Sequence, residues 1–221
     1  MSKTAVRSYT DDQLLNRIKT IEGFKSFPLG RFIIGVRSNE DTFDTYDDKF
    51  YEFENMAGDL HSENMKIKFI RVLTGTTNSG GKQLKGGFKS FNKYGSAILK
   101  ADKWYYNVWS YGLHRGKMPA LKQVGSKVTV YRDGDLDNKA EEIGTPISGW
   151  YGINYHTNTY DFSKKSLSIV RWFIGNWSAG CQVINDRDEY MRQMDYYRLA
   201  KNEGWQRFVS YCLINEFDPN E

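Results

Sequence analysis

A cysteine in a run of small residues, and a histidine upstream of it, are the residues best suited to chemistry. Cys181 follows Ser178-Ala179-Gly180, and His156 ends an apolar, aromatic stretch. A thiol nucleophile needs a general base within about 3 Å and a lowered pKa, which an adjacent imidazolium usually supplies. It also needs backbone N–H donors for an oxyanion, and a turn of small residues lets the backbone approach a substrate closely. The segment 149–185 is therefore a candidate site for a cysteine nucleophile with a histidine base.

Both residues also have a structural interpretation. A lone cysteine in a strand is often a small buried hydrophobe, and a histidine beside aromatic residues often serves only as a hydrogen-bonding group. A catalytic pair is recognised by its geometry and not by its spacing along the chain. The residue types alone leave catalysis and packing both open. Cys212, in the continuous apolar stretch 208–214, is expected to be buried and inert.

A second group of polar residues surrounds His114. Arg115 and Lys117 follow it closely, and a guanidinium suits the planar carboxylate of a substrate. An ordinary solvated turn is the competing and favoured interpretation. Trp177 precedes the small-residue run, with Trp172 nearby, and these rings either wall a cleft or fill the core.

No metal or cofactor site is expected from these residues. The three histidines, His61 included, form no zinc-binding pattern, and two cysteines cannot make a cysteine-only zinc site. An acidic run is formed by Glu40, Asp41, Asp44, Asp47 and Asp48. It lacks the glycine and the terminal glutamate of an EF-hand loop, so we expect a solvated acidic loop.

The composition is that of a globular protein. The chain has 221 residues, of which 39% are hydrophobic, and a net charge of +4. These values exclude the disordered and collagen-like classes, and a small, scattered positive charge does not indicate a nucleic-acid-binding protein. No apolar run approaches the ~18 residues that a membrane helix needs. The start of the chain lacks the apolar region of a secretory signal, so we expect synthesis in the cytoplasm.

Many short strands and two helices are predicted along the chain. The helices are expected over 10–23 and 186–203, and the strands over 31–37, 50–54, 67–75, 103–112, 127–135, 149–156 and 207–217. This order indicates a mainly β or α+β protein, with a β-sandwich or barrel-like sheet and two flanking helices. We expect an N-terminal helical segment, 1–25, and a single domain, 26–221. A boundary in the glycine-rich stretch 75–96 is the alternative.

Two short motifs in this region resemble the catalytic domain of the L,D-transpeptidases, the YkuD-like family. They are Gly152-Ile153-Asn154-Tyr155-His156 and Trp177-Ser178-Ala179-Gly180-Cys181-Gln182-Val183. The similarity is greatest to divergent members encoded by phages or by Bacteroidetes. The resemblance implies that Cys181 is the nucleophile and His156 its base, with the imidazole oriented by the backbone carbonyl of Thr157. It also implies an oxyanion hole made by the N–H groups of Gly180 and Cys181.

The sequence departs from the family pattern at two positions beside the cysteine. Ala179 stands where many members have a second histidine, and Val183 stands where many have arginine or asparagine. These departures concern substrate orientation more than the nucleophile, and Gln182 or Asn185 could replace the missing polar contact. The residues expected to contact or position the substrate are Ser178, Gln182, Trp177, His114 and Arg115.

The resemblance implies acyl transfer or hydrolysis on the stem peptides of peptidoglycan, without a metal or an organic cofactor. Because no secretory signal is expected, a structural or binding component of a phage particle with the same fold is the main alternative, with virion proteins as its partners. A particle-borne enzyme, or one released to the cell wall on lysis, satisfies both interpretations. A papain-like protease is disfavoured because the cysteine precedes the histidine in that family.

Overall fold

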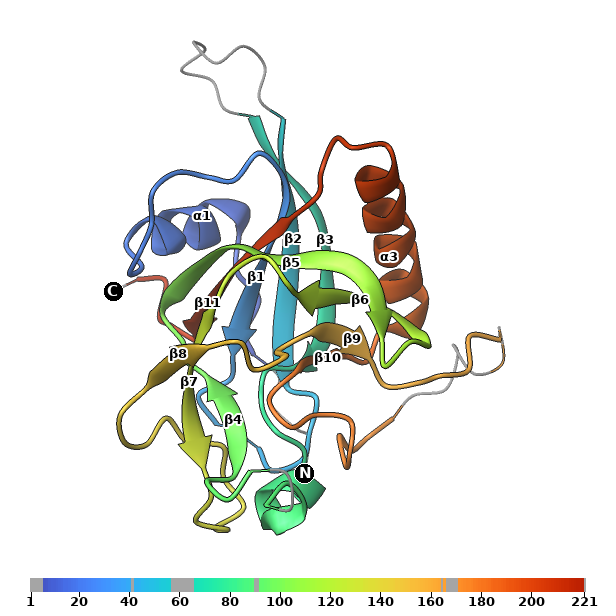
Figure 1. Ribbon diagram of the computed structural model, residues 1–221. Helices are drawn as coiled ribbons and strands as arrows, with labels where there is room; N and C mark the ends of the chain where they lie inside the picture. Colours follow the sequence, from blue (N-terminus) through green and yellow to red (C-terminus); the bar gives the residue numbers. More distant parts are fainter. Residues whose placement is uncertain are drawn as a thin grey trace.

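The computed structural model describes residues 6–40, 42–56, 66–89, 92–163, 165 and 171–220. Eight strands close into a barrel in the order β1-β11-β5-β6-β9-β10-β3-β2 (Figure 1). Their bounds are β1 Gly30–Arg37, β2 Asp48–Met56, β3 Lys66–Thr76, β5 Lys103–His114, β6 Met118–Gln123, β9 Tyr155–Thr157, β10 Gln182–Ile184 and β11 Val209–Asn215. The expected mainly β fold with a barrel-like sheet is confirmed.

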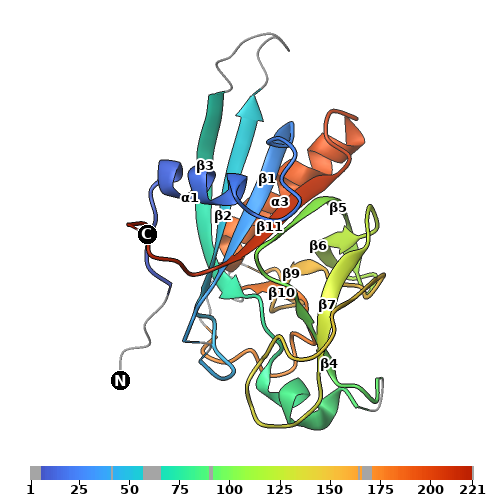
Figure 2. The ribbon, with the colours of Figure 1, turned by 90° about the vertical axis from the view of Figure 1, so that its left-hand side faces the viewer.

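A small second sheet lies at one end of the barrel. It is formed by β4 (Ser96–Leu99), β7 (Val128–Asp133) and β8 (Ile147–Gly149), and the short π-helical turn η1 (Gln83–Gly87) lies at the same end (Figures 1 and 2). The η1 turn lies within the glycine-rich stretch 75–96.

Two α-helices flank the barrel, as expected, although the first ends at Lys19 and not at Gly23. In α1 (Asp11–Lys19), the Thr10 side chain and Gln13 form a reciprocal capping box. Leu14 and Ile18 are buried among side chains from β1, β2, β5 and β11, so the N-terminal segment shares a hydrophobic cluster with the barrel. The second helix, α3 (Arg187–Asn202), contacts β5 and β6.

Strands β1 and β11 bury side chains on both faces. Ile33 and Leu213 belong to one hydrophobic cluster, to which α3 contributes Tyr190, Met194 and Tyr197. Cys212 is fully buried in the other cluster, on the α1 side, which agrees with the expectation of an inert thiol. Because both faces of β1 and β11 are covered, polar and apolar residues alternate only weakly along these two strands.

Several local expectations differ from the structure. The predicted strand 149–156 is divided between β8 and β9, and strands β4, β6 and β10 were not predicted. The expectation of a solvated acidic loop is wrong for Asp47 and Asp48, which are buried. Asp48 accepts hydrogen bonds from Ser38 N–H (2.7 Å) and Thr77 N–H (2.6 Å), and burial raises its pKa to about 7. Asp41 and His61 lie outside the described residues.

The irregular backbone between β8 and β9 is held by one buried side chain, that of Gln123. Its Oε1 accepts hydrogen bonds from Tyr151 N–H (3.1 Å) and Ile153 N–H (3.0 Å), and its Nε2 donates to Gly149 O (3.1 Å). These bonds replace a strand ladder, so Gln123 determines how the chain enters β9.

Within the described part of the chain, no helix has the length and apolar character needed to cross a membrane.

Replacing Gln123 tests this support. The change Gln123→Ala leaves two backbone N–H groups and a carbonyl without partners, so we expect a loss of about 3 kcal/mol in the free energy of unfolding. Lys122→Ala, a neighbouring truncation of a half-buried side chain, should change it by less than about 0.5 kcal/mol. Urea denaturation of both variants measures the difference, and equal stabilities would refute the role of Gln123.

Candidate active site

The parallel pairing of β9 with β10 puts Cys181 and His156 on the same face of the barrel wall. Gln182 pairs with Tyr155 and Val183 with His156, and Gln182 N–H donates to Asn154 O (2.9 Å). Gln182 and Tyr155 face the interior, because the amide of Gln182 accepts from the buried Tyr211 hydroxyl (2.8 Å). Side chains alternate along strands, so Cys181, which directly precedes β10, and His156 lie on the opposite face from Gln182 and Tyr155, as diagonal neighbours.

The turn before Cys181 is shaped by backbone constraints. Gly180 has φ of 122°, and a Cβ there would lie 2.3 Å from Ala97 O in β4. The Ser178 hydroxyl donates to Cys181 O (2.8 Å) and accepts from Gly180 N–H (3.1 Å). Ser178 is therefore a buried turn residue, and only glycine fits at position 180.

The hydrogen bonds of His156 define its tautomer. Its Nδ1 lies 2.7 Å from Thr157 O. A carbonyl oxygen can only accept, so Nδ1 carries the proton and the neutral ring keeps a lone pair on Nε2. This Nε2 is buried and has no hydrogen-bond partner among the described residues. The contact between His156 and the Thr157 carbonyl is the one that the family resemblance implies.

His114 lies against His156 and has the opposite tautomer. The two rings stack with centroids 4.4 Å apart and planes at 22°. Asn154 Oδ1 accepts from Gln123 N–H (2.9 Å), so its Nδ2 is the atom that donates to His114 Nδ1 (3.0 Å). The proton of neutral His114 is therefore on Nε2. The favoured interpretation of His114 as part of a solvated turn is wrong, because His114 is the last residue of β5 and is partly buried against His156.

Both members of the candidate pair are neutral at rest. Burial lowers the pKa of His156 to about 3, with a further contribution from His114. Burial raises the pKa of Cys181 to about 11, and its Sγ donates to Gly152 O (3.5 Å). The sequence-based expectation of an imidazolium that lowers the thiol pKa therefore differs from this arrangement, in which burial disfavours charge on either group.

A pocket of about 650 Å³ opens beside the imidazoles. It is lined by Lys82, His114, Arg115, His156, Tyr160, Arg171, Phe173, Ile174, Gly175, Asn176 and Trp177. The pocket thus brings together three of the expected site residues, His114, Arg115 and Trp177, with the candidate base. Cys181 is half-buried next to β9 and does not line this pocket.

Three of the expected roles do not fit this geometry. The Gln182 amide is fully buried and bonded inside the barrel, so it does not face a substrate. Ser178 is likewise buried. The Gly180 N–H is engaged by the Ser178 hydroxyl, whereas the Cys181 N–H has no acceptor among the described residues, which leaves it as the open backbone donor.

Residues that sequence reasoning missed supply much of the site. Asn154 orients His114, and Lys82 and Arg171 line the pocket from segments distant in sequence. Asn154 belongs to the motif at 152–156, so its position in the sequence could have indicated a role in the site. Nothing local to Lys82 or Arg171 linked either residue to the candidate site, because only the fold brings them to the pocket.

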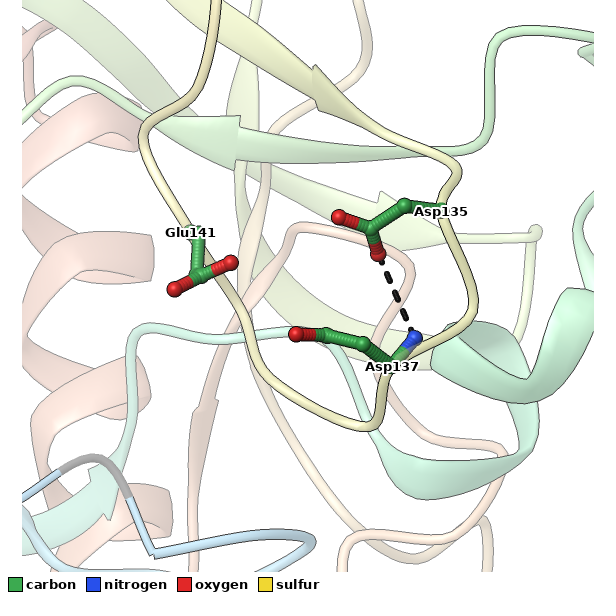
Figure 3. A group of neighbouring side chains, drawn as sticks. All are labelled: Asp135, Asp137 and Glu141. Carbon is green, nitrogen blue, oxygen red and sulfur yellow. Dashed lines mark hydrogen bonds between the residues drawn. The ribbon is translucent and has the colours of Figure 1, made fainter.

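A separate acidic group lies on the connection between β7 and β8. The carboxylates of Asp135, Asp137 and Glu141 come within 4.8 Å of one another (Figure 3). Asp135 Oδ1 also accepts from Asp137 N–H (3.2 Å). The two aspartates are exposed, and exposed acidic groups of this kind occur commonly without an ion.

Comparison with known proteins adds no assignment: no family model, curated protein or solved structure matches the chain. The interpretation of the site therefore depends on its geometry and on the two short motifs.

The tautomers of the two histidines are directly measurable. Nitrogen NMR should find the proton of His156 on Nδ1 and that of His114 on Nε2, with His156 neutral between pH 5 and 8. Because the pKa of folded His156, about 3, lies below the ordinary value of 6.5, the unfolded chain binds the proton first on acidification. Stability should fall as the pH drops below about 6.5, by up to about 1.4 kcal/mol per pH unit. Titration of His156 near pH 6.5, or no difference in this slope between wild type and His156→Gln, would contradict the assignment.

Proposed function

We propose that the protein is a cysteine acyltransferase or hydrolase that acts on the stem peptides of peptidoglycan. The observation that carries this proposal is the lone pair on His156 Nε2, which is buried, has no partner in the described part of the chain and faces the same side of the barrel wall as a thiol. Other buried polar atoms of the described residues, such as Ser79 Oγ and Ser96 Oγ, also lack a hydrogen-bond partner, but His156 differs from these two residues because it lines the pocket. A role as the base that accepts the proton of Cys181 explains why His156 Nε2 has no partner.

The chemistry begins from the neutral pair. The thiol turns away from Gly152 O, and Nε2 of His156 takes its proton as Sγ attacks the substrate carbonyl carbon. The Cys181 N–H and the His114 Nε2–H stabilise the oxyanion. The C–N bond then breaks, the proton passes from His156 to the leaving amine, and a thioester remains on Cys181. An acceptor amine gives a cross-link from this thioester, and water gives hydrolysis.

The choice of peptidoglycan is supported by the motifs at 152–156 and 177–183, which resemble those of the L,D-transpeptidases. The position of His114 adds to this support. Many family members have a second histidine where Ala179 stands, and His114 brings a second imidazole to the base from another strand. In this proposal the protein acts either from a phage particle or after release to the cell wall.

The raised pKa of Cys181 also favours a second candidate, a binding component of a phage particle without catalysis. A thiol that stays protonated at neutral pH is a poor nucleophile when no base assists it. Formation of a thioester separates the two candidates, because only the enzyme needs it.

Mass spectrometry can detect that thioester. Incubation with a tetrapeptide donor or a carbapenem should add the acyl group to Cys181, and Cys181→Ala should abolish the adduct. His156→Gln should slow its formation by about 10²- to 10⁴-fold, because a positioned base is lost. Cys212→Ala is the matched control and should keep the adduct, since that thiol is sealed in the α1-side cluster. An adduct that persists in Cys181→Ala would refute the proposal.

Alkylation tests the ionisation state of the thiol independently of any substrate. Only the thiolate reacts, so the rate with iodoacetamide should rise about tenfold per pH unit from pH 7 towards the pKa of about 11. The sign follows from burial, which disfavours the charged form. A rate that is already at its plateau below pH 7 would mean a thiolate–imidazolium pair and would contradict the neutral ground state.

A further inference from the structure

Three cationic side chains converge on the pocket from separate parts of the chain. Lys82 comes from the start of η1, Arg115 from the turn between β5 and β6, and Arg171 from the segment that leads to Trp177. No carboxylate lines the pocket among the described residues, and none of the three cations has an ion-pair partner there. Other arginines of the barrel, such as Arg37 and Arg71, are paired with glutamates.

The three residues are exposed, and two of them, Lys82 and Arg171, contact the loop that carries Gly175 and Trp177. The Arg171 guanidinium lies over the Trp177 ring, 5.8 Å from its centroid, and Lys82 N–H bonds to Gly175 O (3.3 Å). The nearby carboxylate of Asp44 is used by the backbone, since its Oδ1 accepts from Gly81 N–H and Gly175 N–H, both at 2.7 Å. Asp44 thus connects the loop of Gly81 with the loop of Gly175, and it does not line the pocket.

Arg115 connects the cationic group with the reacting residues. It follows His114 directly, and with Gly116 it forms the two central residues of the turn between β5 and β6, both of which have a positive φ (51° and 71°). Burial is the main cause of the lowered pKa of both imidazoles and of the raised pKa of Cys181; the charge of Arg115 adds to the first effect and opposes the second. An anion bound at Arg115 would therefore lie close to the proposed base.

We propose that Lys82, Arg115 and Arg171 bind a carboxylate of the donor peptide adjacent to the bond that is cleaved. Unpaired cations in a concave site attract an anion, and guanidinium groups bind carboxylates with two parallel hydrogen bonds. A stem peptide offers two sources of such a group: the side-chain carboxylate of a diaminopimelate residue, which lysine lacks, and the terminal carboxylate of the leaving D-alanine. This inference rests on the proposed function and adds the substrate feature that the site selects.

Binding of matched peptides to the Cys181→Ala variant tests the subsite without catalysis. The probes are a diaminopimelate tetrapeptide, the same peptide with its side-chain carboxylate amidated, and the same peptide with a terminal carboxamide. Calorimetry should show a loss of affinity of about 10- to 100-fold for the peptide that lacks the recognised carboxylate. The arm that weakens identifies the source of the carboxylate.

Arginine variants in the same background assign the effect. Arg115→Gln and Arg171→Gln should weaken binding of the full peptide and remove the discrimination, whereas Arg198→Gln, an exposed arginine of α3, should do neither. Thermal unfolding checks that each variant is folded. Equal affinity for all three peptides, no binding of any of them, or discrimination that survives in both pocket variants would overturn the subsite.

The subsite and the proposed function fail in different ways. Selective binding without a thioester on the wild-type protein would leave the subsite standing and refute the acyl transfer. A thioester that forms equally fast from all three peptides would support the acyl transfer and refute the subsite.

Discussion

The hydrogen bond from His156 Nδ1 to Thr157 O is the constraint on which the proposed chemistry depends. It fixes the tautomer and so leaves a lone pair on Nε2, which is buried and has no hydrogen-bond partner among the described residues. The parallel register of β9 and β10 then decides which side chain shares that face, and it selects Cys181. A shift of one residue in this register would send the thiol into the interior and Gln182 outwards.

A series of hydrogen-bonded amide side chains supports this arrangement. Gln123 holds the backbone before β9, its own N–H orients Asn154, and Asn154 in turn orients His114. Because each amide uses its oxygen for a backbone N–H, the direction of every bond is determined, and the two stacked imidazoles acquire opposite tautomers. One ring thus offers an acceptor and the other a donor at a single pocket.

Part of this could be predicted from the sequence because it depends on local patterns. The cap at Thr10 and the acidic start of 186–203 predict the two helices, and runs such as 31–37 predict long strands with few errors at their ends. Strand β10, with three residues, and β6, which contains Pro119, have no local pattern of their own. They are strands only because distant strands pair with them.

Some residues of the candidate site could likewise be predicted from the sequence, whereas others could not. Cys181, His156 and Gly180 stood out by residue type and by the two motifs, and Arg115 by its neighbourhood with His114. The inward direction of Gln182 depends on strand register, and the approach of Lys82 and Arg171 depends on the packing of two loops around Asp44. Neither can be derived from spacing. Burial also reverses the expected charge of the pair, because a sequence does not reveal how much solvent reaches a thiol.

The role of His156 as a base is tested most directly by the pH dependence of thioester formation in His156→Gln. If His156 removes the thiol proton, hydroxide can replace it, so the deficit of this variant relative to wild type should shrink by about tenfold per pH unit between pH 7 and 10. A deficit that stays constant over this range would mean that His156 only supports the structure, and the neutral thiol–imidazole account would be wrong.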